Sequence, residues 1–411
     1  MLDDFQEKAA ALDESDPLRG FRDRFLVPDG SDVVAYLDGN SLGRPAVATA
    51  ERMDRFIRQE WGHRLIRGWG EEWLDWPQVV GDRLGQVALG AAAGQVVVAD
   101  STSVLLYKLA RAAVSARPGR GEIVLDVNDF PTDRYVMDGI AQECGLELRW
   151  LATEPAAGAT VEQVADAVGP DTALVVLSHV NYRSGYLVDA EAITRIAHEA
   201  GALVLWDLSH TVGSVPVRLD EWNADFAVGC TYKYLNGGPG SPAFGYVNQR
   251  HHDAVRQPIR GWIGHRDPFA MGPGYEAAPG VRGMLSGTPP ILAMLPLITG
   301  LDLLEQAGID AVRAKSEQLT GFAVELAEAE LVDRGVELLS PRDPKRRGSH
   351  ITLRRHDFGE FIAPLWERGV IPDFRTPDGI RIGLAPLSTS FAELHRGLSV
   401  LTELVDERSE R

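Results

Sequence analysis

The chain has 411 residues, with 41 lysines and arginines against 59 aspartates and glutamates, which gives a formal charge of −18. Hydrophobic residues make up 45% and charged residues 24%, a composition typical of a globular protein and not of a disordered or fibrous one. The excess negative charge repels nucleic-acid phosphates and anionic membranes, so we expect neither as a partner. With two cysteines, no charged-then-apolar leader and no apolar run of roughly 18 residues, we expect a soluble cytoplasmic protein without a disulfide framework.

The first 45 residues predict an amino-terminal arm. They are polar and mixed in charge apart from residues 33–38, a short apolar run that predicts a strand ending at Gly39-Asn40. Pro45 favours a helix start immediately afterwards, because proline suits the first helical position.

From residue 96 onward, short apolar runs alternate with helical stretches. Strands are expected at 96–99, 123–125, 173–177, 203–206 and 226–228, and helices at 105–114, 133–144 and 189–200. Because the strand runs are apolar throughout, they predict a mostly parallel sheet that helices cover on both faces. The fold class is therefore α/β.

This alternation ends near residue 250. The segment 258–290 is rich in glycine and proline and is too long for a simple connector, which indicates a function or an interface. A helix at 290–306, then helices and short strands up to residue 411, predict a smaller α+β C-terminal domain. His251 and His252 have no third ligand nearby, so no metal site is expected.

Polar residues gather directly after the predicted strands. Ligands of open α/β sheets bind outside the carboxyl ends of the strands. Five polar clusters at these positions therefore predict a binding site more strongly than one cluster would. The five clusters are Asp100 to Ser103, Phe130 to Asp133, Ser178-His179, Asp207 to His210, and Thr231 to Lys233.

Lys233 and Asp207 indicate the chemistry of this site. A lone lysine is more often a surface residue, but a desolvated lysine forms Schiff bases. Pyridoxal phosphate needs such a lysine and a carboxylate that keeps its pyridine nitrogen protonated, and its phosphate suits a helix N-terminus with small hydroxyls. Ser101-Thr102-Ser103 offers those hydroxyls, so the ordered set predicts pyridoxal phosphate.

Ser41 supports a rival hypothesis. Gly39-Asn40-Ser41-Leu42-Gly43 matches the GxSxG elbow of serine hydrolases, with Asp207 and His210 following in triad order. The elbow should follow several strands, however, and only a short arm precedes Ser41. The serine hydrolase remains a remote alternative.

Two other signals leave alternatives open. Trp61, Trp69, Trp73 and Trp76 indicate either core packing or a wall against an aromatic substrate. Arg381 lies inside an apolar run, where an unpaired charge is costly, so it needs a carboxylate partner from the chain or from substrate.

Over nearly its whole length, the sequence resembles the kynureninase family, pyridoxal-phosphate enzymes with the aspartate-aminotransferase fold (fold type I). The most distinctive stretches are Asn40-Ser41-Leu42-Gly43, Phe130-Pro131-Thr132-Asp133 and Tyr232-Lys233-Tyr234-Leu235-Asn236-Gly237-Gly238-Pro239-Gly240. The resemblance also accounts for the Ser41 motif without a hydrolase elbow. One departure is Leu105, where relatives often have asparagine; it follows the phosphate turn and leaves the cofactor contacts intact.

The resemblance implies a role for each matching residue. Lys233 would carry the cofactor, Asp207 would pair with its ring nitrogen, and Tyr232 would complete the catalytic set. Arg381 would bind the substrate α-carboxylate, and Asn40, Ser41 and Trp69 would line its aryl end. The implied cofactor-binding residues are Thr102, Ser103, Phe130, Pro131, Thr132, Asp133, Ser178, Asp207, His210, Tyr232, Lys233, Trp262 and Thr288, and Gly287 and Thr288 would also contact substrate.

The implied reaction is hydrolytic Cβ–Cγ cleavage of L-kynurenine to anthranilate and L-alanine, in tryptophan breakdown. Gly287 and Thr288 resemble the bacterial version, which favours unhydroxylated kynurenine; a preference for 3-hydroxykynurenine or another substituted kynurenine is the alternative. We expect a homodimer with active sites at the interface. The expected division is an arm at 1–45 that contributes to the active site and the small domain, a large cofactor-binding domain at 46–300, and a small domain at 301–411.

Overall fold

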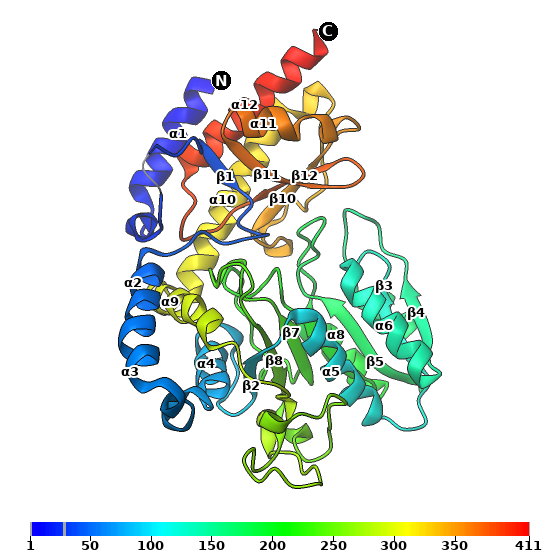
Figure 1. Cartoon of the computed structure of the whole chain (residues 1–411). Helices are drawn as coiled ribbons and strands as arrows, with labels where there is room; N and C mark the ends of the chain where they lie inside the picture. The colour runs from blue at the N-terminus through cyan, green and yellow to red at the C-terminus, as the bar shows by residue number, and fades with distance from the viewer. Residues whose placement is uncertain (1, 28–29, 411) are drawn as a thin grey trace.

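The computed structural model describes residues 2–27 and 30–410 and contains two sheets. The seven-stranded sheet has the order β2-β8-β7-β6-β5-β3-β4, and the five-stranded sheet has the order β1-β11-β12-β10-β9. In Figure 1 the five-stranded sheet and both chain ends lie at the top, and the seven-stranded sheet lies below.

The seven-stranded sheet is mostly parallel, as predicted. Strands β4, β3, β5, β6 and β7 run parallel to one another, and β8 is antiparallel to both β7 and β2. The bounds are β2 Val96–Ala99, β3 Glu122–Asp126, β4 Glu147–Leu151, β5 Thr172–Ser178, β6 Leu203–Asp207, β7 Phe226–Gly229 and β8 Ala243–Val247. The predicted strands match β2, β3, β5, β6 and β7, whereas β4 and β8 were not predicted.

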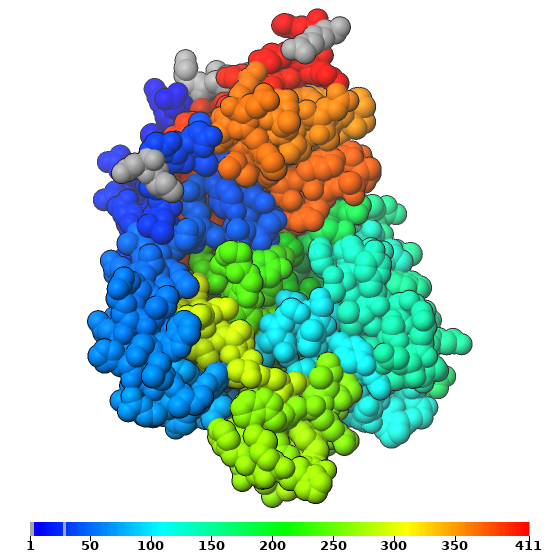
Figure 2. All heavy atoms as spheres, viewed as in Figure 1, coloured from blue at the N-terminus to red at the C-terminus, as the bar shows by residue number. Residues whose placement is uncertain are grey.

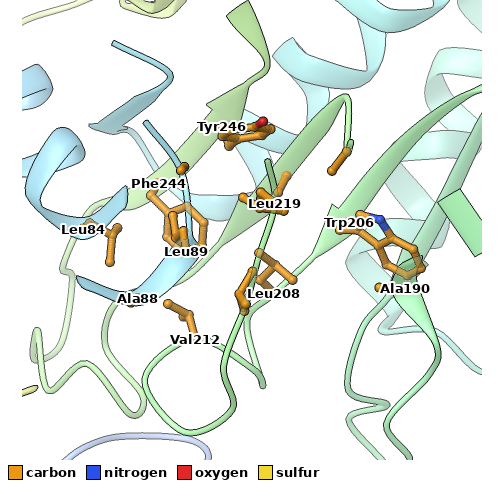
Figure 3. Close-up of a cluster of buried hydrophobic side chains, with 14 of the residues drawn as sticks. Leu84, Ala88, Leu89, Ala190, Trp206, Leu208, Val212, Leu219, Phe244 and Tyr246 are labelled. Atoms are coloured by element: carbon orange, nitrogen blue, oxygen red, sulfur yellow. The ribbon is translucent and has the colours of Figure 1, made fainter. Parts of the chain in front are cut away.

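Both faces of this sheet are buried, because alternate side chains enter two different cores. Val204 and Trp206 of β6 pack into one core, and Leu203 and Leu205 pack into the other. Figure 3 shows part of the first core, where Trp206 lies beside Ala190 and Phe244 lies among leucines. The period of two along each strand thus fixes which side chains meet which layer of helices.

Helices cover the sheet on these two faces. Helix α5 contributes Leu105 and Leu109, and α6 contributes Met137 and Ile140, to the core that contains Leu205. The helices of this part are α2 Val47–Arg55, α3 Gly62–Arg64, α4 Trp76–Leu84, α5 Thr102–Ser115, α6 Pro131–Cys144, α7 Val161–Ala167, α8 Ala190–Glu199 and α9 Ile291–Ala307.

The five-stranded sheet joins the two ends of the chain. Strand β1 (Ala35–Leu37) pairs in parallel with β11 (Val370–Arg375), and Leu37 shares a core with Phe322 and Phe391. The other elements are α1 Leu2–Ser15, α10 Ile309–Glu330, β9 Glu337–Leu338, β10 His350–Arg354, α11 Ile362–Glu367, β12 Gly379–Gly383 and α12 Phe391–Ser409. The domain limits at residues 45 and 300 stay a prediction.

The segment between β8 and α9 contains short 3-10 turns and no long element, and it forms the yellow-green protrusion at the lower end of Figure 2. Within the described residues, no single helix is both long and apolar enough to cross a membrane; only α9 and α10 taken together pass that test, and they meet at an 86° bend. No group of three potential metal ligands occurs in residues 2–27 and 30–410.

Candidate active site

A cavity of about 580 Å³ lies at the carboxyl ends of strands β2, β3, β5 and β6. This is the edge where the polar clusters were predicted to meet. Of the predicted cofactor-binding residues, the cavity is lined by Thr102, Ser103, Phe130, Thr132, Asp133, Ser178, Asp207, His210, Tyr232, Lys233 and Thr288.

One end of the cavity is the start of helix α5. Ser101 is the N-cap residue, but its side chain makes no capping hydrogen bond, and Ser101, Thr102 and Ser103 all line the cavity. The amide groups of a first helical turn have no partners within their own helix, so this turn suits an anion. Asp100 lies just before this turn, and its Oδ2 accepts a hydrogen bond of 2.6 Å from the buried Lys108 of the same helix. This ion pair fixes the position of the turn.

Carboxylates line another wall of the cavity. Asp207 is the last residue of β6, and its Oδ1 accepts a hydrogen bond of 2.8 Å from the backbone of Ser209. Burial, followed by the charge of Asp207 and that of Asp129, raises the pKa of Asp133 well above its ordinary value. A side-chain hydrogen bond with Asp207 is among the further causes of this shift, so the two carboxyl groups lie close together in the cavity wall.

Lys233 follows β7 in a buried turn. Its Nζ lies 2.7 Å from His210 Nε2. Burial lowers the pKa of Lys233, and the charges of Arg381 and Arg375 lower it further, so the neutral and nucleophilic amine is favoured. Burial and the neighbouring Lys233 also lower the pKa of His210 well below its usual value.

The turn around Gly43 supports the Lys233 loop from outside. The backbone N–H of Gly43 donates to the carbonyl of Tyr232 over 2.8 Å. A Cβ at residue 43 would lie 2.3 Å from the Lys233 carbonyl oxygen, closer than atoms can approach. The Asn-Ser-Leu-Gly motif therefore has a structural reason to end in glycine.

Aromatic side chains line the cavity together with Lys233. Phe130 is the N-cap residue of α6, Pro131 takes the first helical position behind it, and the Phe130 ring meets Tyr182 edge to face at 5.3 Å. Burial is the main cause that raises the pKa of Tyr232, so its phenol stays protonated. This direction is opposite to the acidification that would ease proton release from Tyr232.

Arg381 has the internal carboxylate partner that its buried position requires. Its Nε lies 2.5 Å from Asp373 Oδ2, its Nη1 donates to the Tyr182 carbonyl over 2.6 Å, and its Nη2 donates to Ser41 Oγ over 3.0 Å. When the side-chain amide of Asn40 is oriented so that its nitrogen donates to Asp38, its oxygen accepts a hydrogen bond from Arg381 Nε at 3.3 Å. The structure thus places Asn40 and Ser41 against Arg381.

Several predicted residues lie elsewhere in this single chain. Trp69 lines a second, apolar cavity of about 420 Å³ together with Phe56, Trp61 and Trp73, and Pro290 borders both cavities. Trp262 is 38% exposed and packs against Phe269. Trp69, Trp262, Pro131, Gly287, Asn40, Ser41 and Arg381 do not line the first cavity.

The predicted site residues did not include Tyr182, Asp129 or Asp373, and Asp100 was predicted only as part of the strand-end cluster from Asp100 to Ser103. Tyr182 follows strand β5 and could have been found by the same strand-end rule. Asp129 Oδ1 accepts from the backbone of Ser178 at 3.2 Å. Asp373 could have been found only from the register of β11 and β12, which places it directly opposite Arg381.

The geometry disfavours the serine-hydrolase hypothesis. Ser41 Oγ accepts from Arg381, whereas His210 Nε2 bonds to Lys233. No hydrogen bond joins Ser41 to His210 in the part of the chain that the structure describes, and a nucleophile elbow requires that bond.

Comparison with solved structures defines the class of fold. A cysteine desulfurase from Thermococcus onnurineus NA1 superposes with a TM-score of 0.80 at 18% identity, covering 91% of this chain and 95% of its own. A mutant of C-DES with glycine covalently linked to its PLP cofactor gives 0.78 at 16% identity, covering 92% and 98%. The chain therefore has the aspartate-aminotransferase-like fold of type I pyridoxal-phosphate enzymes, which confirms the predicted fold class.

Comparison with sequences defines the family. A profile described as the kynureninase C-terminal domain matches residues 312–401. A kynureninase of Pseudomonas fluorescens is 42% identical over 97% of this chain and 95% of its own length. A kynureninase of Burkholderia pseudomallei (strain 1106a) is 43% identical over 99% and 97%. The chain belongs to the kynureninase family, whose members are hydrolases that depend on pyridoxal phosphate, and the predicted family and enzyme class are confirmed.

The side chains in the cavity fit this cofactor. The uncapped start of α5 suits a phosphate, the carboxyl group of Asp207 suits a protonated ring nitrogen, and Lys233 offers an amine whose pKa burial lowers. His210 Nδ1 is buried and has no hydrogen-bond partner among the residues that the structure describes, so it is available to a polar ligand.

Proposed function

We propose that this protein hydrolyses the Cβ–Cγ bond of L-kynurenine to give anthranilate and L-alanine, with pyridoxal phosphate bound to Lys233. The observation that carries the proposal is the juxtaposition of the buried Lys233 amine, the Asp207 carboxyl group and the first turn of α5 around one cavity. The 42–43% identity to kynureninases over nearly the whole chain supports this choice of substrate.

Each group of residues has a place in holding the cofactor. Ser101, Thr102 and Ser103 would hold the phosphate with the amides of α5, and Phe130 would lie on the ring. Asp207 would face the ring nitrogen, with the carboxyl group of Asp133 beside it. When bound, pyridoxal phosphate supplies an electron sink that stabilises negative charge on carbon next to the substrate amine.

The residues of the chain then bind substrate and move protons. Arg381 would hold the α-carboxylate. The Lys233 amine, whose pKa burial lowers, would take the Cα proton, and His210 would accept a hydrogen bond from it. Tyr232 would return a proton to the three-carbon product. Burial raises the pKa of Tyr232, so the phenol carries the proton that this step needs.

A homodimer with shared active sites is part of the proposal. The second cavity is apolar, borders the first at Pro290, and lies near exposed apolar side chains that include Trp61 at 47% and Leu292 at 39%. Apolar surface of this kind is typical of a protein interface. Sedimentation velocity should give a dimer mass; a monomer at micromolar concentration would contradict this part.

The preference for unhydroxylated kynurenine rests on the loop before α9. Thr288 lines the first cavity, and a Cβ added at Gly287 would meet open space, so this loop can accept an aryl group beside it. The alternative, a preference for 3-hydroxykynurenine, requires a polar partner for the extra hydroxyl.

The test is release of fluorescent anthranilate from L-kynurenine by the cofactor-loaded protein, with 3-hydroxykynurenine in parallel. The variants are Lys233→Ala and, as a matched control, Lys345→Ala, which removes an exposed lysine. We expect turnover in the wild type and the control, and none in Lys233→Ala. Turnover by Lys233→Ala, or no product from either substrate in protein that shows the visible absorption of bound cofactor, would refute the proposal.

A further inference from the structure

Arg381 is already engaged by the chain on all three of its nitrogens. Asp373 meets Nε and Nη2 at 2.5 Å, Ser41 meets Nη2, and the Tyr182 carbonyl meets Nη1. A carboxylate binds arginine best through two adjacent nitrogens that are both free to donate. Each nitrogen of Arg381 already has a partner within the chain, so a second donor nearby would strengthen the binding of a substrate carboxylate.

Arg375 stands where that second donor would be. Residues 373 and 375 are two apart on β11, so their side chains share one face of the sheet, and Asp373 lies directly opposite Arg381 on β12. Arg375 Nε donates to Asp373 Oδ2 over 2.8 Å, on the oxygen that also accepts from Arg381. A single carboxylate oxygen therefore holds two guanidinium groups side by side.

The terminal nitrogens of Arg375 are free to bind a ligand. Neither Nη bonds to any residue that the structure describes, and the side chain is 34% exposed, against 1% for Arg381. After burial, the charge of Arg375 is among the causes that lower the pKa of His210, which lines the active-site cavity. The guanidinium of Arg375 is thus close enough to influence the groups around Lys233.

We propose that Arg375 binds the α-carboxylate of the amino-acid substrate together with Arg381, and that Asp373 is the positioning residue that holds both guanidinium groups. This inference rests on the proposed function for the identity of the substrate. It adds a second binding arginine, which neither the predicted site nor the cavity lining includes.

The experiment compares two ligands that differ only at the carboxylate. L-Alanine and L-alaninamide are titrated into the cofactor-loaded enzyme, and binding is followed by the change in visible absorption. In Arg375→Gln we expect the dissociation constant of L-alanine to rise about 10- to 100-fold, the loss of one charge-assisted hydrogen bond, and that of L-alaninamide to change less than about twofold. The control Arg354→Gln removes an arginine of β10 that pairs with Glu337 in the same sheet, and it should change neither value.

The outcomes separate binding from folding and from the proposed function. Equal weakening of both ligands, or no weakening of L-alanine, would overturn the proposal. If Arg375→Gln fails to fold, Arg375→Lys keeps the charge and should show a smaller but still carboxylate-specific loss. L-Alanine binding does not depend on kynurenine turnover, so an enzyme that binds L-alanine in this way but releases no anthranilate would contradict the proposed function alone.

Asp373 is tested by coupling. In an Asp373→Asn background the two arginines lose their shared anchor, so the further effect of Arg375→Gln on L-alanine binding should shrink to less than about threefold. A merely structural role for Asp373 would leave the two effects additive, and additive effects would overturn the positioning assignment.

Discussion

Asp225 is a buried anchor behind the active site, and its replacement by asparagine should destabilise the protein without touching the cavity. Its side chain is 1% exposed and accepts four hydrogen bonds. Oδ2 accepts from His198 at 2.7 Å and from the Val204 backbone at 2.8 Å, and Oδ1 accepts from Arg250 at 2.5 Å and His251 at 2.7 Å. These bonds tie α8, β6 and the turn after β8 to the start of β7.

The size of the effect follows from the atoms that asparagine changes. The side-chain amide in Asp225→Asn would keep one acceptor oxygen and replace the other with a donor, so two of the four donors would lose their acceptor. At about 1.5–3 kcal/mol for each bond to a charged group, the loss is about 3–6 kcal/mol. Because the His198 side chain is 25% exposed and can reach water, the lower part of this range applies, about 3–5 kcal/mol.

Thermal unfolding followed by circular dichroism would measure the effect. At about 2 °C for each kcal/mol in a large chain, Asp225→Asn should melt roughly 6–10 °C below the wild type at pH 7. The control Asp166→Asn, at an exposed position on α7, should melt within about 2 °C of it. A melting temperature for Asp225→Asn equal to that of the control would refute the reasoning.

The effect should also depend on pH. Burial alone would raise the pKa of Asp225, but hydrogen bonds from His198 and His251 hold this pKa below its ordinary value. A carboxylate with a lowered folded-state pKa contributes stability above its unfolded pKa of about 4 and loses that contribution as the pH falls through the folded pKa. The difference in melting temperature between wild type and Asp225→Asn should therefore be largest at pH 7 and become smaller below about pH 4. An unchanged difference at pH 3 would contradict this account.

Three further predictions concern the cavity. Gly43→Ala should lower kcat at least about tenfold, because its Cβ would displace the Lys233 carbonyl; a crystal structure with an unmoved Lys233 loop and full activity would contradict this. Lys108→Met leaves Asp100 unpaired beside the phosphate turn and should raise the cofactor dissociation constant about 10-fold or more, measured by fluorescence; unchanged affinity would argue against a role for that ion pair. Asp207→Asn should lower kcat at least about 100-fold with an unchanged circular dichroism spectrum, and a variant that loses its fold instead would make Asp207 a structural residue.

The fold was predictable where local pattern and burial agree. The continuous apolar run at 96–99 became β2, and the run at 203–206 became most of β6. Strand β4 was not predicted because it lies at the sheet edge and carries exposed, charged side chains. Strand β8 was not predicted because Pro242 precedes it and Gly245 interrupts its pattern, yet both neighbouring strands bury it.

The site was predictable to the extent that its residues follow strands. Asp207 ends β6 and Lys233 follows the neighbouring strand β7, so the strand-end rule brings them to one edge. The surroundings of Arg381 could not be predicted in the same way, because Ser41, Tyr182 and Asp373 reach it from three distant parts of the chain. The sequence indicated that Arg381 needs a carboxylate, but only the pairing of β11 with β12 identifies Asp373 as that partner.

The pairing of β1 with β11 has a consequence for synthesis on the ribosome. Ala35 pairs with Val370, which is 370 − 35 = 335 positions further along the chain. The amino-terminal strand therefore leaves the ribosome long before its partner exists, and an edge that waits unpaired is prone to misassociation. Because Ser41 lies just after this strand and bonds to Arg381, this part of the site can assemble only after residue 381 has been made.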